Sequence, residues 1–162
     1  MTLPTELTLC NTAEGIRLFI NPVREIEKLH EKKLIQTAGE TGEGEKSLAV
    51  IQGELLDIQI EIDIGSASCI SLIIRGVEIS YHPQTQQLTC LDKAANLDPM
   101  NGKIKLRILV DRTSIEIFGN NGRVYMPMGV ILDEADQSLA MSVAGGQARL
   151  TSLEIYQLKS IW

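Results

Sequence analysis

A period-two alternation constrains this chain more than any other feature of its sequence. In LLDIQIEIDIG, residues 55–65, apolar residues occupy every second position, and acidic or amide residues occupy the positions between them. Successive side chains of a strand point to opposite faces, so the segment predicts a half-buried strand with one wet face. Similar runs recur at short intervals between turn-rich sequences. The other expected strands are residues 67–75, 77–82, 87–91, 103–111, 114–119, 123–127, 139–144 and 148–158.

Many short strands with frequent turn signals favour an all-β fold, a two-sheet antiparallel β-sandwich of the jelly-roll or lectin-like type. The length of 162 residues suggests a single domain covering residues 1–162. At most one short helix is expected, near residues 22–33, where apolar residues stand at helical spacing. Residues 40–46 are expected to form a solvated loop, and residues 96–102 a turn. The Asn121–Gly122 pair suits a type I′ hairpin, which needs positive φ at both positions.

Composition excludes several classes of function. The net charge of −6 argues against binding along a nucleic-acid backbone, which needs a basic stripe. The longest apolar runs are strand-sized, so no membrane span is expected. The three cysteines, Cys10, Cys69 and Cys90, are far apart and are expected to be buried free thiols. The two histidines, His30 and His82, lack metal-ligand spacing, so neither a metal site nor another cofactor is expected.

The segment VDRTSIEIFGNNGR, residues 110–123, places two carboxylates close together. If residues 103–111 and 114–119 form a hairpin, Leu109 lies opposite Glu116. Asp111 and Glu116 are then diagonal neighbours on the outer face, ~7–8 Å apart at the backbone. This separation is compatible with a glycosidase pair, whose carboxyl groups lie ~5–9.5 Å apart.

The surrounding charges argue against a catalytic pair. A general acid needs a raised pKa, which an apolar pocket usually provides. Arg107 is expected diagonally from Glu116, and Arg112 adjoins Asp111, so both carboxylates should be ionised and salt-bridged. The pattern therefore favours a structural or sugar-binding polar face over a proton-donating site.

The same segment resembles the signature hairpin of the C-terminal β-sandwich of glycoside hydrolase family 32, the levanases, inulinases, invertases and related β-fructosidases. Residues 1–9, MTLPTELTL, are similar to the stretch that enters this domain after the catalytic propeller. Residues 21–29, NPVREIEKL, are similar to the Pro-Val-x-Glu stretch that follows. The closing residues 142–162 are similar to the last strands of the family, and the resemblance covers nearly the whole chain in the right order.

The resemblance also implies where catalysis takes place. The family carries its nucleophile, stabiliser and acid/base in Trp-x-Asn-Asp-Pro-Asn-Gly, Arg-Asp-Pro and Glu-Cys motifs of an N-terminal propeller. None of these motifs occurs here: Trp162 is the only tryptophan, and Met100 follows Pro99 where the family has Asn. The resemblance therefore implies an isolated accessory sandwich without catalytic residues, either a truncated product or an excised piece.

Three functions follow as hypotheses. The first is a structural domain that packs on the catalytic propeller of a fructan hydrolase and contributes to homo-oligomer contacts. Outward-facing Leu109 and Phe118, together with Tyr125 and Met126, are either residues that await this partner, ordinary surface or a second small cluster.

The second hypothesis is a fructan-binding module, because some levan-binding modules resemble the same sandwich. Its candidate carbohydrate-binding residues are Asp111, Arg112, Glu116 and Tyr125, with Tyr81 or Tyr156 as further aromatic platforms. The low aromatic content of 4% argues against it.

The third hypothesis is a stand-alone hydrolase, which the missing motifs disfavour.

Family members that act on polysaccharides are usually exported, so the parent is expected to be periplasmic or extracellular, although unpaired cysteines fit an oxidising compartment poorly.

Overall fold

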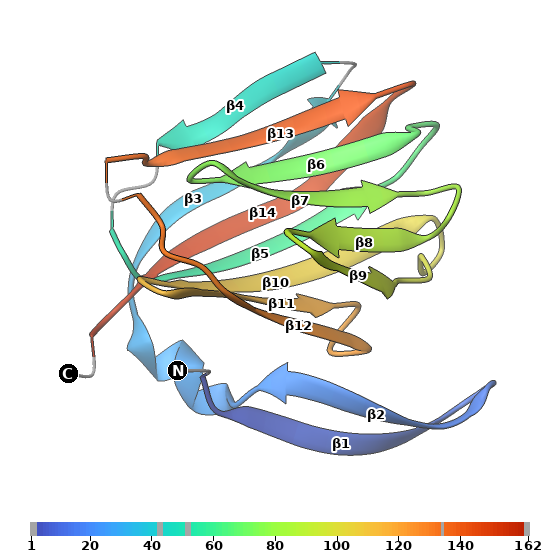
Figure 1. The fold of residues 1–162 in the computed structure, drawn as a ribbon, viewed down its shortest axis with the longest axis horizontal. Helices are drawn as coiled ribbons and strands as arrows, with labels where there is room; N and C mark the ends of the chain where they lie inside the picture. The colour runs from blue at the N-terminus through green and yellow to red at the C-terminus, as the bar shows by residue number, and fades with distance from the viewer. Residues whose placement is uncertain (1–2, 42–43, 51–52, 134, 161–162) are drawn as a thin grey trace.

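The chain folds into two stacked antiparallel sheets with a separate two-stranded hairpin below them (Figure 1). The computed structural model describes residues 3–41, 44–50, 53–133 and 135–160. Sheet 1 has the strand order β12-β11-β10-β5-β14-β3, and sheet 2 has the order β4-β13-β6-β7-β8-β9. The predicted all-β sandwich is therefore confirmed.

The elements have the following bounds. Sheet 1 contains β3 (His30–Thr41), β5 (Leu56–Asp63), β10 (Lys103–Asp111), β11 (Ser114–Gly119), β12 (Val124–Gly129) and β14 (Ala148–Leu158). Sheet 2 contains β4 (Gly44–Val50), β6 (Cys69–Ile74), β7 (Val77–His82), β8 (Gln87–Cys90), β9 (Lys93–Asn96) and β13 (Ser138–Ala144). The N-terminal hairpin consists of β1 (Thr5–Thr12) and β2 (Gly15–Pro22), and the 3₁₀ helix η1 (Arg24–Leu29) connects it to β3.

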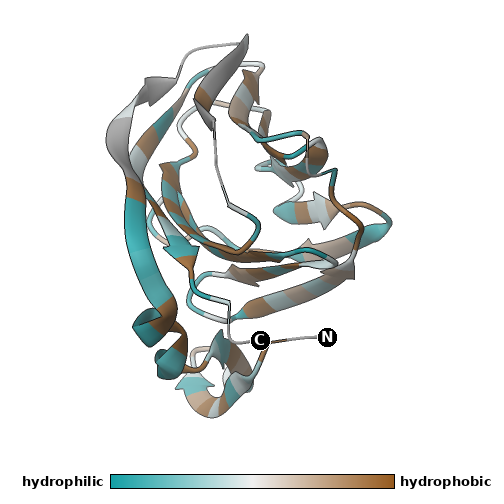
Figure 2. Cartoon of the chain, turned by 90° about the vertical axis from the view of Figure 1, so that its left-hand side faces the viewer, coloured by the Kyte–Doolittle hydropathy of each residue, from teal (hydrophilic) through white to brown (hydrophobic). Residues whose placement is uncertain are grey.

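The main core lies between the two sheets and follows the alternation of the strands. Ile58, Ile60 and Ile62 of β5 point inward and are almost fully buried, whereas the residues between them point outward. Figure 2 shows the same alternation as hydrophobic and hydrophilic bands along the strands. Tyr81 lies in the core and donates a hydrogen bond from its hydroxyl to the Leu97 carbonyl at 3.0 Å. Burial of alternate side chains thus sets the strand register.

Several predicted elements differ from the observed ones. The short helix exists, but it is a 3₁₀ helix that ends at Leu29, and residues 30–33 already belong to β3. The expected loop over residues 40–46 is too long: residues 40–41 end β3 and residues 44–46 begin β4, and residues 42–43 lie outside the described ranges. Strands β1, β2, β3, β4 and β9 were not predicted. β3 lies at one edge of sheet 1, and β4 lies at one edge of sheet 2. Each strand is ordered by hydrogen bonds to a single neighbouring strand, and its own polar sequence does not predict a strand.

Two turn predictions are confirmed in part. Residues 97–102 form an irregular connection that ends in a turn. Asn121 and Gly122 have φ values of 59° and 87°, as expected, and Asn120 has a φ of 45°. Because Gly119 pairs with Val124, the connection has four residues and is longer than the expected two-residue turn. All three cysteines are free, but only Cys90 is buried, and Cys10 and Cys69 are half-buried.

Candidate functional site

The hairpin of residues 103–119 has the register that the sequence predicts. Asp111 pairs with Ser114, Val110 with Ile115 and Leu109 with Glu116. Val110 and Ile115 face the main core, whereas Leu109 and Glu116 face outward from sheet 1. The two carboxylates of residues 111 and 116 therefore lie on the outer face, as expected.

Glu116 is fully enclosed although it points away from the main core. Its exposed fraction is 0%. One carboxylate oxygen accepts a 2.7 Å hydrogen bond from the backbone N–H of Leu3, and the other accepts a 2.6 Å hydrogen bond from the Tyr125 hydroxyl. Burial, followed by this bond to Glu116, raises the pKa of Tyr125 above its usual value. Glu116 thus binds the N-terminal segment to the sheet.

Asp111 ends β10, and Arg112 begins the turn between β10 and β11. The Asp111 carboxylate accepts a 2.7 Å hydrogen bond from the Arg112 backbone N–H. The Arg112 side chain forms an ion pair with Glu54. Hydrogen bonds thus join Arg112 to Asp111 and Tyr125 to Glu116. The sugar-binding role of these four residues stays a prediction.

The expected ion pair between Arg107 and Glu116 is wrong, because Arg107 turns to another carboxylate. Its Nε and Nη2 donate to the two oxygens of Asp57 at 3.0 and 2.6 Å. Asp57 is 0% exposed, and it also contacts His30 Nε2 at 2.9 Å and the Gln59 amide at 3.3 Å. The sequence signalled Asp57 only as one polar residue of a wet strand face. Its role depends on which neighbouring strands bring partners to it.

The residues expected to await a partner are covered by the chain itself. Leu109 and Phe118 are nearly fully buried in a second cluster with Ile26 and Leu158. Tyr125 stacks on Phe118 with 4.9 Å between ring centroids, and Met126 faces the main core. Partly buried Leu3, Ile20, Val23, Leu29 and Leu55 complete this second cluster. The alternative of a second small cluster is therefore correct for Leu109 and Phe118.

The two further tyrosines are also occupied. Tyr81 lies in the main core. Tyr156 stacks on His30 with ring centroids 4.0 Å apart, and Lys33 Nζ lies 5.3 Å from its ring centroid. Neither tyrosine offers an open aromatic platform for a sugar ring.

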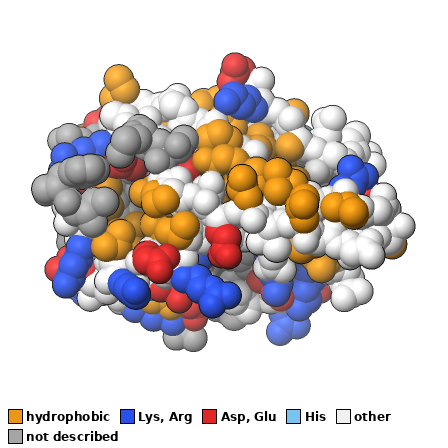
Figure 3. Space-filling model, turned by 90° about the horizontal axis from the view of Figure 1, so that it is seen from below, with side chains coloured by type: hydrophobic (Ala, Val, Ile, Leu, Met, Phe, Trp, Pro, Cys, Tyr) orange, Lys and Arg blue, Asp and Glu red, His pale blue; other side chains and the backbone are white. Residues whose placement is uncertain are grey.

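The N-terminal hairpin has an apolar face that the described chain leaves open. Leu9 pairs with Leu18, and Leu7 pairs with Ile20, so these residues share one face with Ile16. Leu7, Leu9, Ile16 and Leu18 are 62%, 72%, 72% and 48% exposed. Seen from the side on which the hairpin lies, hydrophobic side chains form a band with charged groups along its borders (Figure 3). This surface was missed from the sequence, although alternating apolar residues on both sides of residues 13–14 signal a hairpin.

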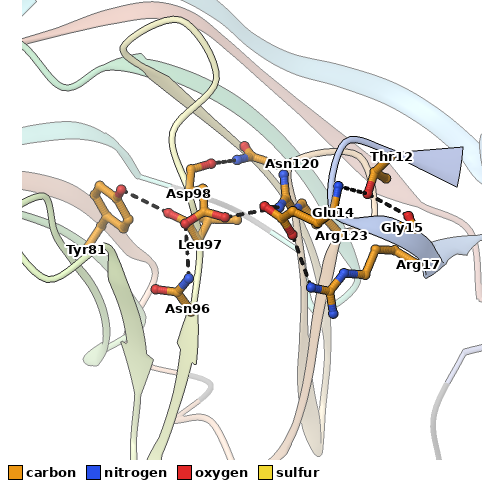
Figure 4. A network of polar contacts seen from close by, with 10 residues as sticks. All are labelled: Thr12, Glu14, Gly15, Arg17, Tyr81, Asn96, Leu97, Asp98, Asn120 and Arg123. Carbon is orange, nitrogen blue, oxygen red and sulfur yellow. Dashed lines mark hydrogen bonds and ion pairs between the residues drawn. The ribbon is translucent and has the colours of Figure 1, made fainter. Parts of the chain in front are cut away.

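The hairpin is attached to sheet 1 through the β11–β12 loop. The Ile20 N–H donates to the Gly122 carbonyl at 2.8 Å, and the Asn21 amide donates to the Asn121 carbonyl at 2.9 Å. Arg123 bridges the two parts, since its Nη2 lies 2.9 Å from Glu14 and 3.1 Å from Asp98 (Figure 4). The hydrogen bond and charge of Arg123 lower the pKa of Glu14. These contacts fix the direction of the apolar face relative to the sandwich.

A polar groove of about 420 Å³ lies beside this attachment, on the outer face of sheet 1. Its polar lining comes from β5, β10 and β14, with Asn21 and Asn121 at one side. Within the groove, hydrogen bonds from Lys103 and Lys105 lower the pKa of Glu61 to about 2.

The described residues meet the requirements of neither a metal site nor a membrane-spanning helix. No group of three or more His, Cys, Asp or Glu residues within the described ranges is placed to hold a metal ion. Within the same ranges, no helix has the length and the apolar character that crossing a bilayer requires.

The two stacked antiparallel sheets give the chain a β-sandwich fold. The family model described as "Glycosyl hydrolases family 32 C terminal" matches residues 25–157, and the chain belongs to this family. The N-terminal hairpin, residues 5–22, precedes the matched range.

Curated relatives and solved structures agree with this assignment. The chain is 28% identical to a levanase of Bacillus sp. (strain L7), with 100% of the chain and 20% of that protein covered. It is 29% identical to a levanase of Bacillus subtilis (strain 168), with 99% and 27% covered. Its fold matches an exo-inulinase from Aspergillus awamori with a TM-score of 0.89 at 20% identity, over 100% of this chain and 36% of that structure. The chain thus spans about a fifth to a quarter of the levanases.

Proposed function

We propose that this chain is the non-catalytic accessory sandwich of a fructan-hydrolysing glycosidase and that it packs on the catalytic propeller of its parent enzyme. The observation that carries the proposal is the open apolar face of the N-terminal hairpin, formed by Leu7, Leu9, Ile16 and Leu18. Contiguous exposed apolar patches mark interaction sites, because water solvates them at a cost.

The size of the face supports a stable intramolecular contact. Full burial of one large aliphatic side chain contributes about 1.5–3 kcal/mol, so covering four half-exposed or exposed residues contributes several kcal/mol. The hairpin is also preorganised, since Arg123 and the β11–β12 loop hold it in one orientation. A preorganised surface loses little conformational entropy when a partner docks.

The buried carboxylates support a role without catalysis. Glu116 is enclosed by Leu3 and Tyr125, and Asp57 is engaged by Arg107 and His30. A glycosidase needs two carboxyl groups on either side of a bound glycosidic bond. The purified chain should therefore release no fructose from levan, inulin or sucrose, and release above a heat-treated control would contradict the proposal.

A domain-replacement chimaera tests the docking surface directly. Residues 1–162 would replace the segment of the Bacillus subtilis levanase that they match. We expect the chimaera to hydrolyse levan and to unfold in one cooperative thermal transition. Leu9→Lys combined with Leu18→Lys places two charges in the centre of the apolar face, and should lower activity and separate the transition into two.

Thr8→Lys is the matched control, because Thr8 is exposed on the opposite face of the same strand. It should leave both the activity and the single transition unchanged. Equal behaviour of the Leu9/Leu18 and Thr8 chimaeras would show that the apolar face does not carry the contact.

A further inference from the structure

The polar groove on sheet 1 contains a regular grid of side chains from three adjacent strands. Arg107 of β10 and Glu154 of β14 both pair with Gln59 of β5, which lies between them. In the next outward-facing row, Lys105 and Ser152 both pair with Glu61. Neighbouring strands lie ~4.8 Å apart and alternate residues ~6.8 Å apart, so the grid measures ~10 by ~7 Å. This is the size of a small cyclic ligand rather than of a protein loop.

The charges of the grid are balanced within the chain. Glu61 binds Lys103 and Lys105 at 2.9 and 3.1 Å. Glu154 binds Lys33 at 2.7 Å. Arg107 is bound to Asp57 by two hydrogen bonds. An anionic or cationic ligand would have to compete with these pairs, so the groove favours a neutral ligand.

Side chains at the centre of the grid can nevertheless form further hydrogen bonds. Arg107 uses Nε and Nη2 for Asp57, and its Nη1 lies 4.0 Å from Glu27, beyond hydrogen-bond distance. Gln59 donates its amide to Asp57, and its side-chain carbonyl accepts no hydrogen bond from the described residues. The Ser152 hydroxyl is exposed and has no hydrogen-bond partner within the described ranges. These groups offer a donor, an acceptor and a hydroxyl that serves as either.

We propose that this groove binds a neutral sugar, with Arg107, Gln59 and Ser152 hydrogen-bonding to its hydroxyl groups. Neighbouring hydroxyl groups of a sugar both donate and accept hydrogen bonds, which matches the donor, the acceptor and the hydroxyl that the grid offers. The volume of about 420 Å³ lies within the ~300–1,000 Å³ typical of small-molecule sites. The ion pairs hold the side chains in place before the ligand arrives, which reduces the entropy that binding costs.

The ligand probe for the test is an inulin-type fructose trisaccharide, a choice that rests on the proposed function. Titration into the ¹⁵N-labelled full chain should give saturable shifts at the backbone amides of β5, β10 and β14 around the grid. Shifts confined to the β10–β11 turn, or no saturable shift at millimolar ligand, would overturn the proposal. This mapping needs no variant and is independent of whether the hairpin docks on a propeller.

Two variants then test the grid itself. Ser152→Trp fills the groove from an exposed position and should weaken binding at least tenfold, whereas Gln59→Ala should weaken it severalfold. Arg149→Trp is the matched control, since Arg149 is exposed on the same strand and pairs with Asp63, outside the groove lining. Equal affinity of the Ser152 and Arg149 variants would contradict the proposal. Tighter binding of fructose 6-phosphate than of fructose would contradict the neutral-ligand argument.

Discussion

Sheet 1 and the N-terminal hairpin both carry apolar side chains that lie outside the main core, yet only those of sheet 1 are covered. On sheet 1, Leu109 and Phe118 are almost fully buried beneath the N-terminal segment and η1. On the hairpin, Leu9 and Ile16 are each 72% exposed. An alternating strand pattern shows which residues share a face, but the cover of that face depends on segments distant in sequence.

The charged pairs of the two regions differ in the same way. In the Asp57–Arg107 pair the Asp57 side chain is fully buried, whereas Glu14 and Arg17 of the hairpin form a pair with both side chains more than half exposed. Removal of Arg107 leaves a buried carboxylate without its bidentate partner. Arg107→Ala should lower the free energy of unfolding by about 3–5 kcal/mol.

Arg17→Ala is the corresponding change on the hairpin and should cost about 1 kcal/mol or less, because water screens an exposed pair. Urea denaturation followed by circular dichroism measures both values. Similar losses in the two variants would contradict the distinction between the covered and the open region.

Two leucines provide the sharpest test of the apolar faces. Leu109→Ala creates a cavity in the second cluster and should destabilise the chain by about 2–5 kcal/mol. Leu9→Ala removes a side chain that is already in water, and should change stability by about 0.5 kcal/mol or less. The denaturant midpoints of the two purified variants measure both losses of stability. A large loss for Leu9→Ala would mean that the apolar face of the hairpin is covered in solution.

The Gly122 carbonyl accepts a hydrogen bond from the hairpin, so substitution of Gly122 should weaken the contact between the hairpin and the β11–β12 loop of sheet 1. Its φ is +87°, and an added Cβ would lie 2.4 Å from the Ile20 carbonyl oxygen. Gly122→Ala should cost about 1–3 kcal/mol through backbone strain and loss of the contact. Hydrogen exchange at the Ile20 amide should accelerate, because this amide donates to the Gly122 carbonyl.

Gly129→Ala is the control for this change, since an added Cβ at Gly129 meets no atom within 4 Å and its φ is not positive. Unchanged exchange at Ile20 in the Gly122 variant would show that the hairpin does not depend on the loop.

The last prediction concerns the dependence of stability on pH. Hydrogen bonds from Lys103 and Lys105 lower the pKa of Glu61 from 4.5 to about 2 in the folded chain. A lowered folded-state pKa stabilises the protein above pH 4.5, and this contribution disappears as the pH falls towards 2. Glu61→Gln should therefore cost about 1 kcal/mol or less at pH 7, and the difference from the wild type should vanish near pH 2.

Urea denaturation between pH 2 and 7 measures this dependence. Glu14→Gln changes a more exposed carboxylate of the hairpin and should give a smaller difference across the same range. A constant difference between Glu61→Gln and the wild type would exclude the Lys103 and Lys105 contacts as its cause.

The sequence by itself determined the all-β class, the two-residue β10–β11 turn and the register of that hairpin. These features depend on period-two alternation and local turn chemistry, which are visible in neighbouring residues. The family resemblance was visible for the same reason, because the VDRTSIEIF segment and the flanking motifs are continuous in sequence. Edge strands β3 and β4 were missed, since pairing with β14 and β13 rather than local pattern orders them.

Only the tertiary structure decided which outward-facing residues are covered and which carboxylate Arg107 binds. Leu3 reaches Glu116 across 113 residues, and Arg107 reaches Asp57 across 50. Such contacts depend on how distant segments pack, and burial changes the same side chain from a solvated surface group into part of a cluster. Leu109 and Leu9 have the same chemistry and similar local sequence patterns. The difference between them is whether another segment of the chain excludes water from their surface.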